Sequence, residues 1–158
     1  MSTRALCEQL AAALQARGWM LATAESCTGG MIAAACTDLS GSSNWFERGF
    51  VTYSNEAKTE QLGVDAALVG QHGAVSEVVA RAMAFGAVRH SRAQVGVAVT
   101  GIAGPTGGSA DKPVGTVWFG FSVAGQLTSE MRRFDGGRAA VREATVRHAL
   151  LRLLELLA

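Results

Sequence analysis

Residues 94–100 read QVGVAVT, a run that is apolar or β-branched along nearly its whole length. A strand with one solvated face alternates polar and apolar residues, whereas a strand buried on both faces does not. We therefore expect residues 94–100 to form a central strand of a sheet that is covered by helices on both sides.

Helical and strand patterns alternate on either side of this segment. Helices are predicted over residues 2–16, 31–39, 56–62, 77–89 and 139–157. Strands are predicted over residues 19–24, 49–54, 94–100, 115–123 and 127–134, the last two joined by a turn at Ala124 and Gly125. This order predicts an α/β fold, a three-layer α/β/α sandwich with a mixed, mostly parallel sheet of about five strands. No repeat or linker interrupts it, so a single domain is expected over residues 1–158.

The composition is that of an ordinary globular protein, with 158 residues, 49% hydrophobic residues and 17% charged residues. A net charge of +1 gives no support for nucleic-acid binding, which needs a clustered basic surface. No apolar run reaches the roughly 18 residues of a membrane span. Three cysteines without a CxxC pair favour a reduced, cytoplasmic protein. The leucine-rich residues 150–157 (LLRLLELL) exceed what one helix face needs, so a homo-oligomer, a dimer or larger, is expected.

Two glycine-rich segments follow predicted strands. Residues 23–30 read TAESCTGG and lead into a helix, whose N-terminus can attract a phosphate or carboxylate. Residues 100–108 read TGIAGPTGG and follow the most hydrophobic strand. Because ligands of open α/β sheets bind at the carboxyl ends of strands, the two loops predict a ligand cleft.

Residues 41–58, GSSNWFERGFVTYSNEAK, hold the only tyrosine of the chain, Tyr53, and one of its two lysines, Lys58. Arginine is always protonated, whereas a lysine with a lowered pKa can accept a proton, and serine with neutral lysine is a known nucleophile–base pair. With Asn55 as the N-cap, Lys58 takes the third position of a helix, where the helix dipole should lower its pKa. These residues predict acyl transfer or amide hydrolysis, with Tyr53 able to join a hydrogen-bond chain between the lysine and a serine.

Other reactive side chains give weaker signals. The three histidines are scattered, and no metal-ligand spacing is present. Cys27 is expected to be a small buried thiol. Arg138 and Arg142, one turn apart at the start of the last helix, could clamp a phosphate.

Residues 23–30, 41–58, 73–77 (GAVSE), 100–108 and 112–121 (KPVGTVWFGF) together resemble the CinA C-terminal domain family, and more narrowly its stand-alone nicotinamide-nucleotide amidases. The resemblance covers nearly the whole chain, with the motifs in the same order. It implies an α/β/α fold and the hydrolysis of nicotinamide mononucleotide to nicotinic acid mononucleotide and ammonia, in pyridine-nucleotide recycling and without a cofactor or metal.

By motif position, the resemblance also implies catalytic roles for Ser43, Lys58 and Tyr53. Ser42 and Ser26 are the other serines that could attack. The residues expected to bind the substrate are Ser26, Thr28, Gly29, Gly30, Ser42, Thr100, Gly101, Gly104 and Arg142.

Two other functions remain open from the sequence. The chain could be a nucleotide-binding or partner-binding module without catalysis, since CinA-type domains occur in competence and DNA-damage contexts. It could also hydrolyse a different amide or a phosphate ester, because spacing alone does not define the substrate.

Overall fold

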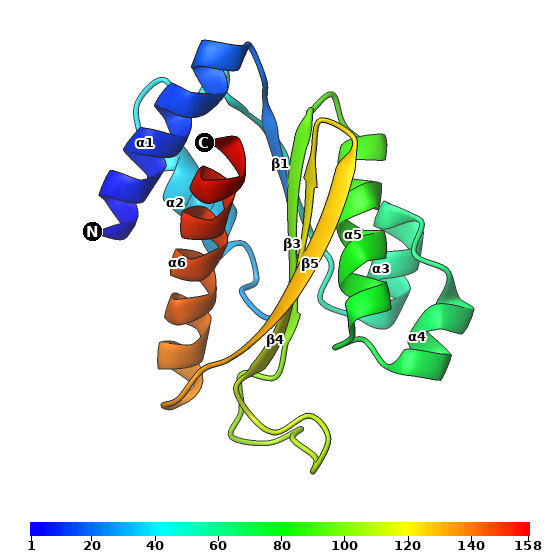
Figure 1. Cartoon of the computed structure of the whole chain (residues 1–158). Helices are drawn as coiled ribbons and strands as arrows, with labels where there is room; N and C mark the ends of the chain where they lie inside the picture. The colour runs from blue at the N-terminus through cyan, green and yellow to red at the C-terminus, as the bar shows by residue number, and fades with distance from the viewer.

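The computed structural model describes residues 1–158, in which one sheet lies between two layers of helices (Figure 1). The five strands are β1 (Leu21–Glu25), β2 (Phe46–Val51), β3 (Val95–Gly101), β4 (Thr116–Val123) and β5 (Gln126–Arg133). The six α-helices are α1 (Thr3–Arg17), α2 (Met31–Thr37), α3 (Asn55–Leu62), α4 (Ala66–His72), α5 (Glu77–Arg89) and α6 (Arg138–Leu157), with one 3₁₀ turn, η1 (Ser42–Asn44).

The strand order in the sheet is β2-β1-β3-β4-β5. β1 pairs in parallel with β2 and β3, β4 is antiparallel to β3, and β5 is antiparallel to β4. Four of the five strands therefore run in one direction, and only β4 opposes them. Val95, Val97, Ala98 and Val99 of β3 are fully buried. The predicted α/β fold with a mixed sheet and a central strand buried on both faces is confirmed.

The two faces of the sheet pack differently. α1, α2 and α6 cover one face over large side chains such as Leu10, Phe119 and Leu150, and α3, α4 and α5 lie on the other (Figure 1). The inner side of this second layer is rich in small residues. A Cβ added to Gly120 of β4 would lie 2.2 Å from the carbonyl oxygen of Ala80 in α5. The sequence thus uses glycine where the backbone of α5 touches the sheet.

The element boundaries differ from the prediction in the segment that carries the site. β2 ends at Val51, opposite the last residue of β1, Glu25, and not at residue 54. Ser54 is extended, and its hydroxyl accepts the N–H of Ala57, so Ser54 is the N-cap of α3 in place of Asn55. Lys58 is consequently the fourth residue of α3. The short helix α4, capped by Asp65, was not predicted, because its seven residues give little periodic signal.

The leucine-rich end of α6 packs mostly into the core of its own chain. Leu150, Leu153 and Leu157 are buried, and Leu154 and Leu156 pack against the same cluster. The expectation of a homo-oligomer was based on these leucines, and their burial in their own chain removes that basis. None of the six helices combines the length and the apolar content that crossing a membrane requires.

Candidate active site

The site lies where the chain connections diverge to opposite faces of the sheet. From β1 the chain enters α2 on one face, and from the adjacent, parallel β2 it enters α3 on the other face. At such a point the loops beyond the carboxyl ends of two neighbouring strands separate and leave a crevice. A pocket of about 230 Å³ lies there, lined by Ser26, Cys27, Tyr53, Lys58, Ala74, Val75, Thr100, Gly101, Ala103 and Arg138.

Ser26 and Lys58 meet in this pocket. Ser26 follows β1 directly, and the side chain of Lys58 comes from the first turn of α3. The Lys58 Nζ lies 3.0 Å from the Ser26 Oγ, 2.9 Å from the carbonyl oxygen of Thr52 and 3.1 Å from that of Tyr53. The lysine is only 1% exposed, although its amine is among the most strongly hydrated groups in proteins.

Burial lowers the pKa of Lys58, because the charged form loses its water. A third carbonyl, that of Ser54, lies 3.5 Å from the amine, so it is burial and not the number of hydrogen-bond partners that favours the neutral form. The neutral amine has the groups that a general base needs. Its two N–H groups can donate to the carbonyls of Thr52 and Tyr53, which leaves the lone pair for the hydroxyl proton of Ser26. This is the arrangement of a nucleophile and its general base.

Ser43 does not reach Lys58. It lies in η1, before β2, and its side chain is exposed, whereas Lys58 follows the other end of that strand. The six residues of β2 alone span roughly 20 Å. The expected pair of Ser43 with Lys58 is therefore not formed, and Ser42, in the same turn, lines no part of the pocket. Ser26 occupies the place beside the lysine instead.

The N-terminus of α2 is already occupied by a carboxylate. Glu25, which is 1% exposed, accepts the backbone N–H groups of Ile32 at 2.8 Å and Ala33 at 3.0 Å. It also accepts the hydroxyl of Thr28 at 2.5 Å. The anion site predicted at this helix thus holds the protein's own side chain. Thr28 is fully buried, and its hydroxyl is bound to Glu25. Neither the N-terminus of α2 nor the Thr28 hydroxyl is therefore free to bind a substrate.

Gly29 and Gly30 shape the loop between Ser26 and α2. Their φ angles are +59° and +105°, values that residues with a side chain rarely adopt. The loop also leaves the N–H groups of Cys27 and Thr28 without an acceptor on any other residue. The two glycines therefore fold the loop and do not line the pocket, while the residues directly after Ser26 keep unused donors.

The two arginines at the start of α6 have different surroundings. Arg142 donates to the carbonyl oxygens of Cys27 at 3.1 Å and Thr28 at 3.3 Å, so it holds the backbone of the Ser26 loop. Arg138 lines the pocket, is exposed, and donates to the carbonyl oxygen of Gly104 at 2.9 Å. Of the pair, Arg138 is the one whose charge faces the opening.

Tyr53 contacts the base through its backbone and faces the pocket with its ring. Its side chain is 63% exposed, and its hydroxyl lies 3.5 Å from Arg138 Nη2. The hydroxyl therefore does not bridge Lys58 and Ser26, which already touch.

The second glycine-rich loop forms the opposite wall. Thr100 and Gly101 line the pocket, but the Thr100 hydroxyl donates to the carbonyl oxygen of Ala74 at 2.9 Å. Gly104 does not line the pocket; its φ is +83°, and an added Cβ would lie 2.4 Å from Val114. Gly104 contributes the carbonyl that orients Arg138.

Cys27 is a buried thiol beside the pair. Burial raises its pKa to about 11, so it stays protonated and is a poor nucleophile. No group of three histidine, cysteine or acidic side chains is placed to hold a metal ion.

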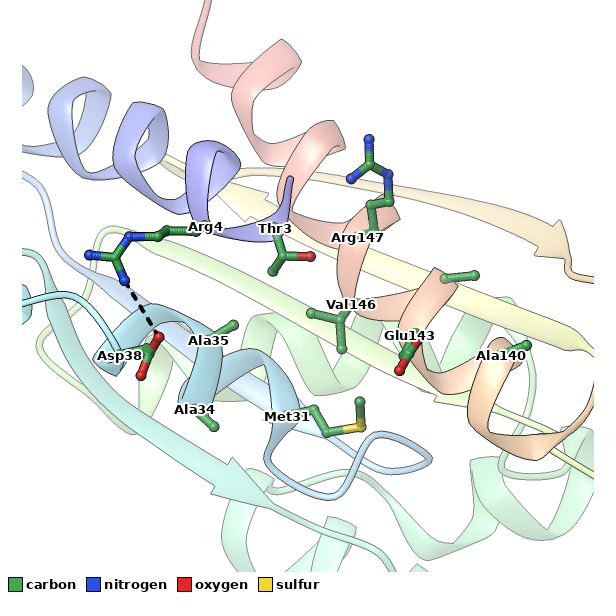
Figure 2. A pocket seen from close by; sticks show the side chains of 11 residues that line it. Thr3, Arg4, Met31, Ala34, Ala35, Asp38, Ala140, Glu143, Val146 and Arg147 are labelled. Atoms are coloured by element: carbon green, nitrogen blue, oxygen red, sulfur yellow. Dashed lines mark ion pairs between the residues drawn. The ribbon is translucent and has the colours of Figure 1, made fainter. Parts of the chain in front are cut away.

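A larger hollow of about 750 Å³ lies between α1, α2 and α6, and Figure 2 shows the side chains that line it. Its walls include Met31, Ala35 and Val146, and Arg4 pairs with Asp38 at 3.7 Å on its rim. No serine, cysteine or lysine lines it, so it offers no nucleophile and base together.

Sequence reasoning missed two parts of the site. Glu25 was not singled out, although an acidic residue that ends a buried strand just before a helix is a recognisable capping signal. The carbonyl oxygens of Thr52 and Tyr53, which surround the lysine amine, leave no trace in side-chain patterns.

Comparison with known proteins places this geometry in context. A model of the CinA C-terminal domain matches residues 3–157. The nicotinamide-nucleotide amidohydrolase PncC of Escherichia coli K12 is 55% identical over 146 residues, which cover 92% of this chain and 88% of that protein. The protein of the same name from Pseudomonas putida is 58% identical over 134 residues, covering 85% and 84%. The crystal structure of the competence/damage inducible protein CihA from Agrobacterium tumefaciens matches with a TM-score of 0.94 at 47% identity, over 99% of each chain.

Proposed function

Because the chain belongs to the CinA C-terminal domain family, we propose that it is an amidase that converts nicotinamide mononucleotide to nicotinic acid mononucleotide and ammonia. The names of the E. coli and P. putida relatives support this substrate. Within the proposal, residues 1–158 form a single amidase domain that acts in the cytoplasm, where its three free cysteines stay reduced, and serves pyridine-nucleotide recycling.

One observation carries the proposal: the 3.0 Å contact between the Lys58 Nζ and the Ser26 Oγ inside a pocket at the carboxyl ends of β1 and β3. Burial favours the neutral form of Lys58, which is the form that can accept a proton. Beside a serine hydroxyl it has the chemistry of a general base.

In the first half of the reaction, Ser26 attacks the carboxamide carbon while its hydroxyl proton moves to the neutral amine of Lys58. The carbonyls of Thr52 and Tyr53 accept hydrogen bonds from the ammonium that forms. The N–H of Cys27, which follows Ser26 and belongs to a residue that lines the pocket, serves as a donor to the oxyanion, and one such donor contributes about 2.7–4 kcal/mol. Lys58 then gives its proton to the departing nitrogen, and ammonia leaves.

In the second half, water attacks the ester on Ser26 and Lys58 accepts the water proton. The proton returns to the Ser26 Oγ as the ester bond breaks, and the carboxylate product is released. The two halves sum to amide plus water giving acid plus ammonia, and Lys58 ends each cycle neutral.

The pocket is too small to enclose the whole mononucleotide, so only one end of the substrate can enter it. A volume of about 230 Å³ is below the roughly 300–1,000 Å³ of pockets that enclose a whole drug-sized ligand. The carboxamide end of the mononucleotide enters toward Ser26, and the phosphate stays at the opening, where Arg138 and the Tyr53 hydroxyl are exposed. Arginine suits this task because its planar fork matches a phosphate.

The proposal is tested by incubating the purified protein with nicotinamide mononucleotide and measuring ammonia, in parallel with free nicotinamide and the dinucleotide. We expect release from the mononucleotide and little from free nicotinamide, which lacks the phosphate. Calorimetric binding of the mononucleotide without ammonia would instead favour a non-catalytic nucleotide-binding module. Ammonia release from a different amide alone would keep the chemistry and change the substrate.

A further inference from the structure

β5 is a long strand at the edge of the sheet with no strand paired to its outer side. It has eight residues, pairs only with β4, and keeps a regular register to its end. The opposite edge, β2, has six residues, includes Gly49 and has an irregular register against β1. Natural proteins protect edge strands by shortening them, by bulges, by proline or by charged side chains. β5 is long, regular and free of proline, and its only feature of this kind is its charged residues, Glu130, Arg132 and Arg133.

The direction of the free backbone groups follows from one hydrogen bond. Phe134, just after β5, donates its N–H to the carbonyl oxygen of Gly115 at 2.9 Å. In an antiparallel ladder this direction alternates from residue to residue. The even-numbered residues of β5 therefore turn their N–H and C=O groups toward β4, and Leu127, Ser129, Met131 and Arg133 turn theirs outward. The outward carbonyl of Leu127 already accepts a hydrogen bond from Arg81 Nη2 at 3.3 Å, which leaves Ser129, Met131 and Arg133 for a partner strand.

Met131 stands in this outward row and is 49% exposed, one of the few large apolar side chains on the surface. Its neighbours on either side, Glu130 and Arg132, carry opposite charges. Glu130 is positioned by His148 at 2.9 Å and Arg152 at 3.4 Å, and Arg132 of the same strand reaches it at 3.8 Å. The side chain of Arg132 is 55% exposed, so this last ion pair is open to solvent and can be exchanged for one with a second copy.

We propose that two copies of this chain pair along β5, antiparallel, with the two-fold axis at Met131. The partner of β5 is then the same strand of a second copy, and the two sheets join into one. Met131 lies opposite Met131 of the second copy, with both backbones exchanging hydrogen bonds. Ser129 pairs in the same way with Arg133 of the second copy.

This register is selected by charge. With the axis at Met131, Glu130 lies directly opposite Arg132 of the second copy, and the contact occurs twice. These are non-hydrogen-bonded pairs, in which opposing side chains are closest. An axis at Glu130 would oppose two carboxylates, and an axis at Arg132 would oppose two guanidinium groups. An axis at Ser129 would leave Glu130 facing an uncharged threonine, Thr128.

The first test is the oligomeric state of charge variants over a concentration series, measured by light scattering after gel filtration. Wild type should be a dimer. Arg132→Glu should be monomeric because it places acidic groups opposite Glu130, while Arg133→Glu, the same charge change opposite a serine, should stay dimeric. A mixture of Arg132→Glu with Glu130→Lys should form a heterodimer, visible by native mass spectrometry, from two monomeric proteins.

The second test fixes the register without altering charge. Paired Cα atoms across antiparallel strands are about 5.5 Å apart in a hydrogen-bonded pair, within disulfide range. Met131→Cys should therefore form an intermolecular disulfide under mild oxidation, and Thr128→Cys, which faces residue 134 of the second copy, should not. A monomeric wild type, a dimer that survives Arg132→Glu, or equal cross-linking at both positions would each overturn the proposal. Glu130→Lys also removes the ion-pair partner of His148 and could disturb the fold. The experiments with Arg132→Glu alone and with Met131→Cys test the proposal without this variant.

Discussion

The amine of Lys58 is buried among backbone carbonyl oxygens. Burial disfavours the ammonium and lowers the pKa, whereas the carbonyls of Thr52 and Tyr53 are acceptors that either form can use. The outcome is an amine that can be neutral at a pH where a solvated lysine is charged. A base of this kind works only in the neutral form.

The rate of amide hydrolysis should therefore rise with pH as Lys58 loses its proton, with an apparent pKa below the usual value of about 10.4. Below that pKa the lysine is charged in the free enzyme and kcat/KM should fall tenfold per pH unit. Initial rates of ammonia release across a pH series measure this.

Lys58→Arg should lose about 10²–10⁴-fold in rate. Lys112→Arg, at the only other lysine, should keep both the rate and the profile; a flat wild-type profile would contradict the role of Lys58.

At this scale the sequence located part of the site. The rarity of lysine and tyrosine singled out Lys58 and Tyr53, and the structure places both at the pocket. The sequence alone did not identify the serine that contacts Lys58. Ser26 follows β1, whereas Lys58 follows β2, and the two residues are 32 positions apart. Closeness in sequence favoured Ser43, yet the whole of β2 separates the two residues in space.

At the scale of elements, α6 places two arginines one turn apart with separate tasks. Arg138→Ala should raise KM for the mononucleotide roughly 10- to 100-fold, because one charge-assisted contact to phosphate contributes about 1.5–3 kcal/mol. Its kcat should change little. Arg142→Ala should mainly lower kcat, because Cys27 and Thr28 lose the side chain that holds their loop. Steady-state kinetics separate the two effects, and a KM effect confined to Arg142→Ala would reverse the assignment.

The packing of α5 on α3 depends on a glycine. A Cβ on Gly86 would lie 2.1 Å from the carbonyl oxygen of Leu62, whereas one on Gly70 of α4 would meet nothing within 4 Å. Gly86→Ala should lower the free energy of unfolding by about 1–3 kcal/mol. Gly70→Ala, the same change in an open helix, should raise it by up to about 1 kcal/mol. Denaturant titration of both variants measures the difference, and equal effects would show that the close approach is unimportant.

For the whole molecule, the fold class followed from patterns that are local in sequence. The unbroken apolar run of β3, the Ala124–Gly125 turn and the capping serine Ser76 each report on their own segment, and the structure has all three features. The strand order and the pairing of β1 with β3 are long-range outcomes of packing, which a single sequence does not display. The site depends on that pairing, since it brings together β1, β3 and the start of α3.

The most direct test of the central claim compares two serines in one assay. Ammonia release from nicotinamide mononucleotide is measured for Ser26→Ala and Ser43→Ala, with circular dichroism to show that both fold. The Ser26–Lys58 pair predicts that Ser26→Ala loses at least about 10³-fold in rate, because the nucleophile itself is removed. Ser43→Ala, changed at an exposed site beyond β2, should keep the wild-type rate. Full activity in Ser26→Ala, or its loss in Ser43→Ala alone, would contradict the account.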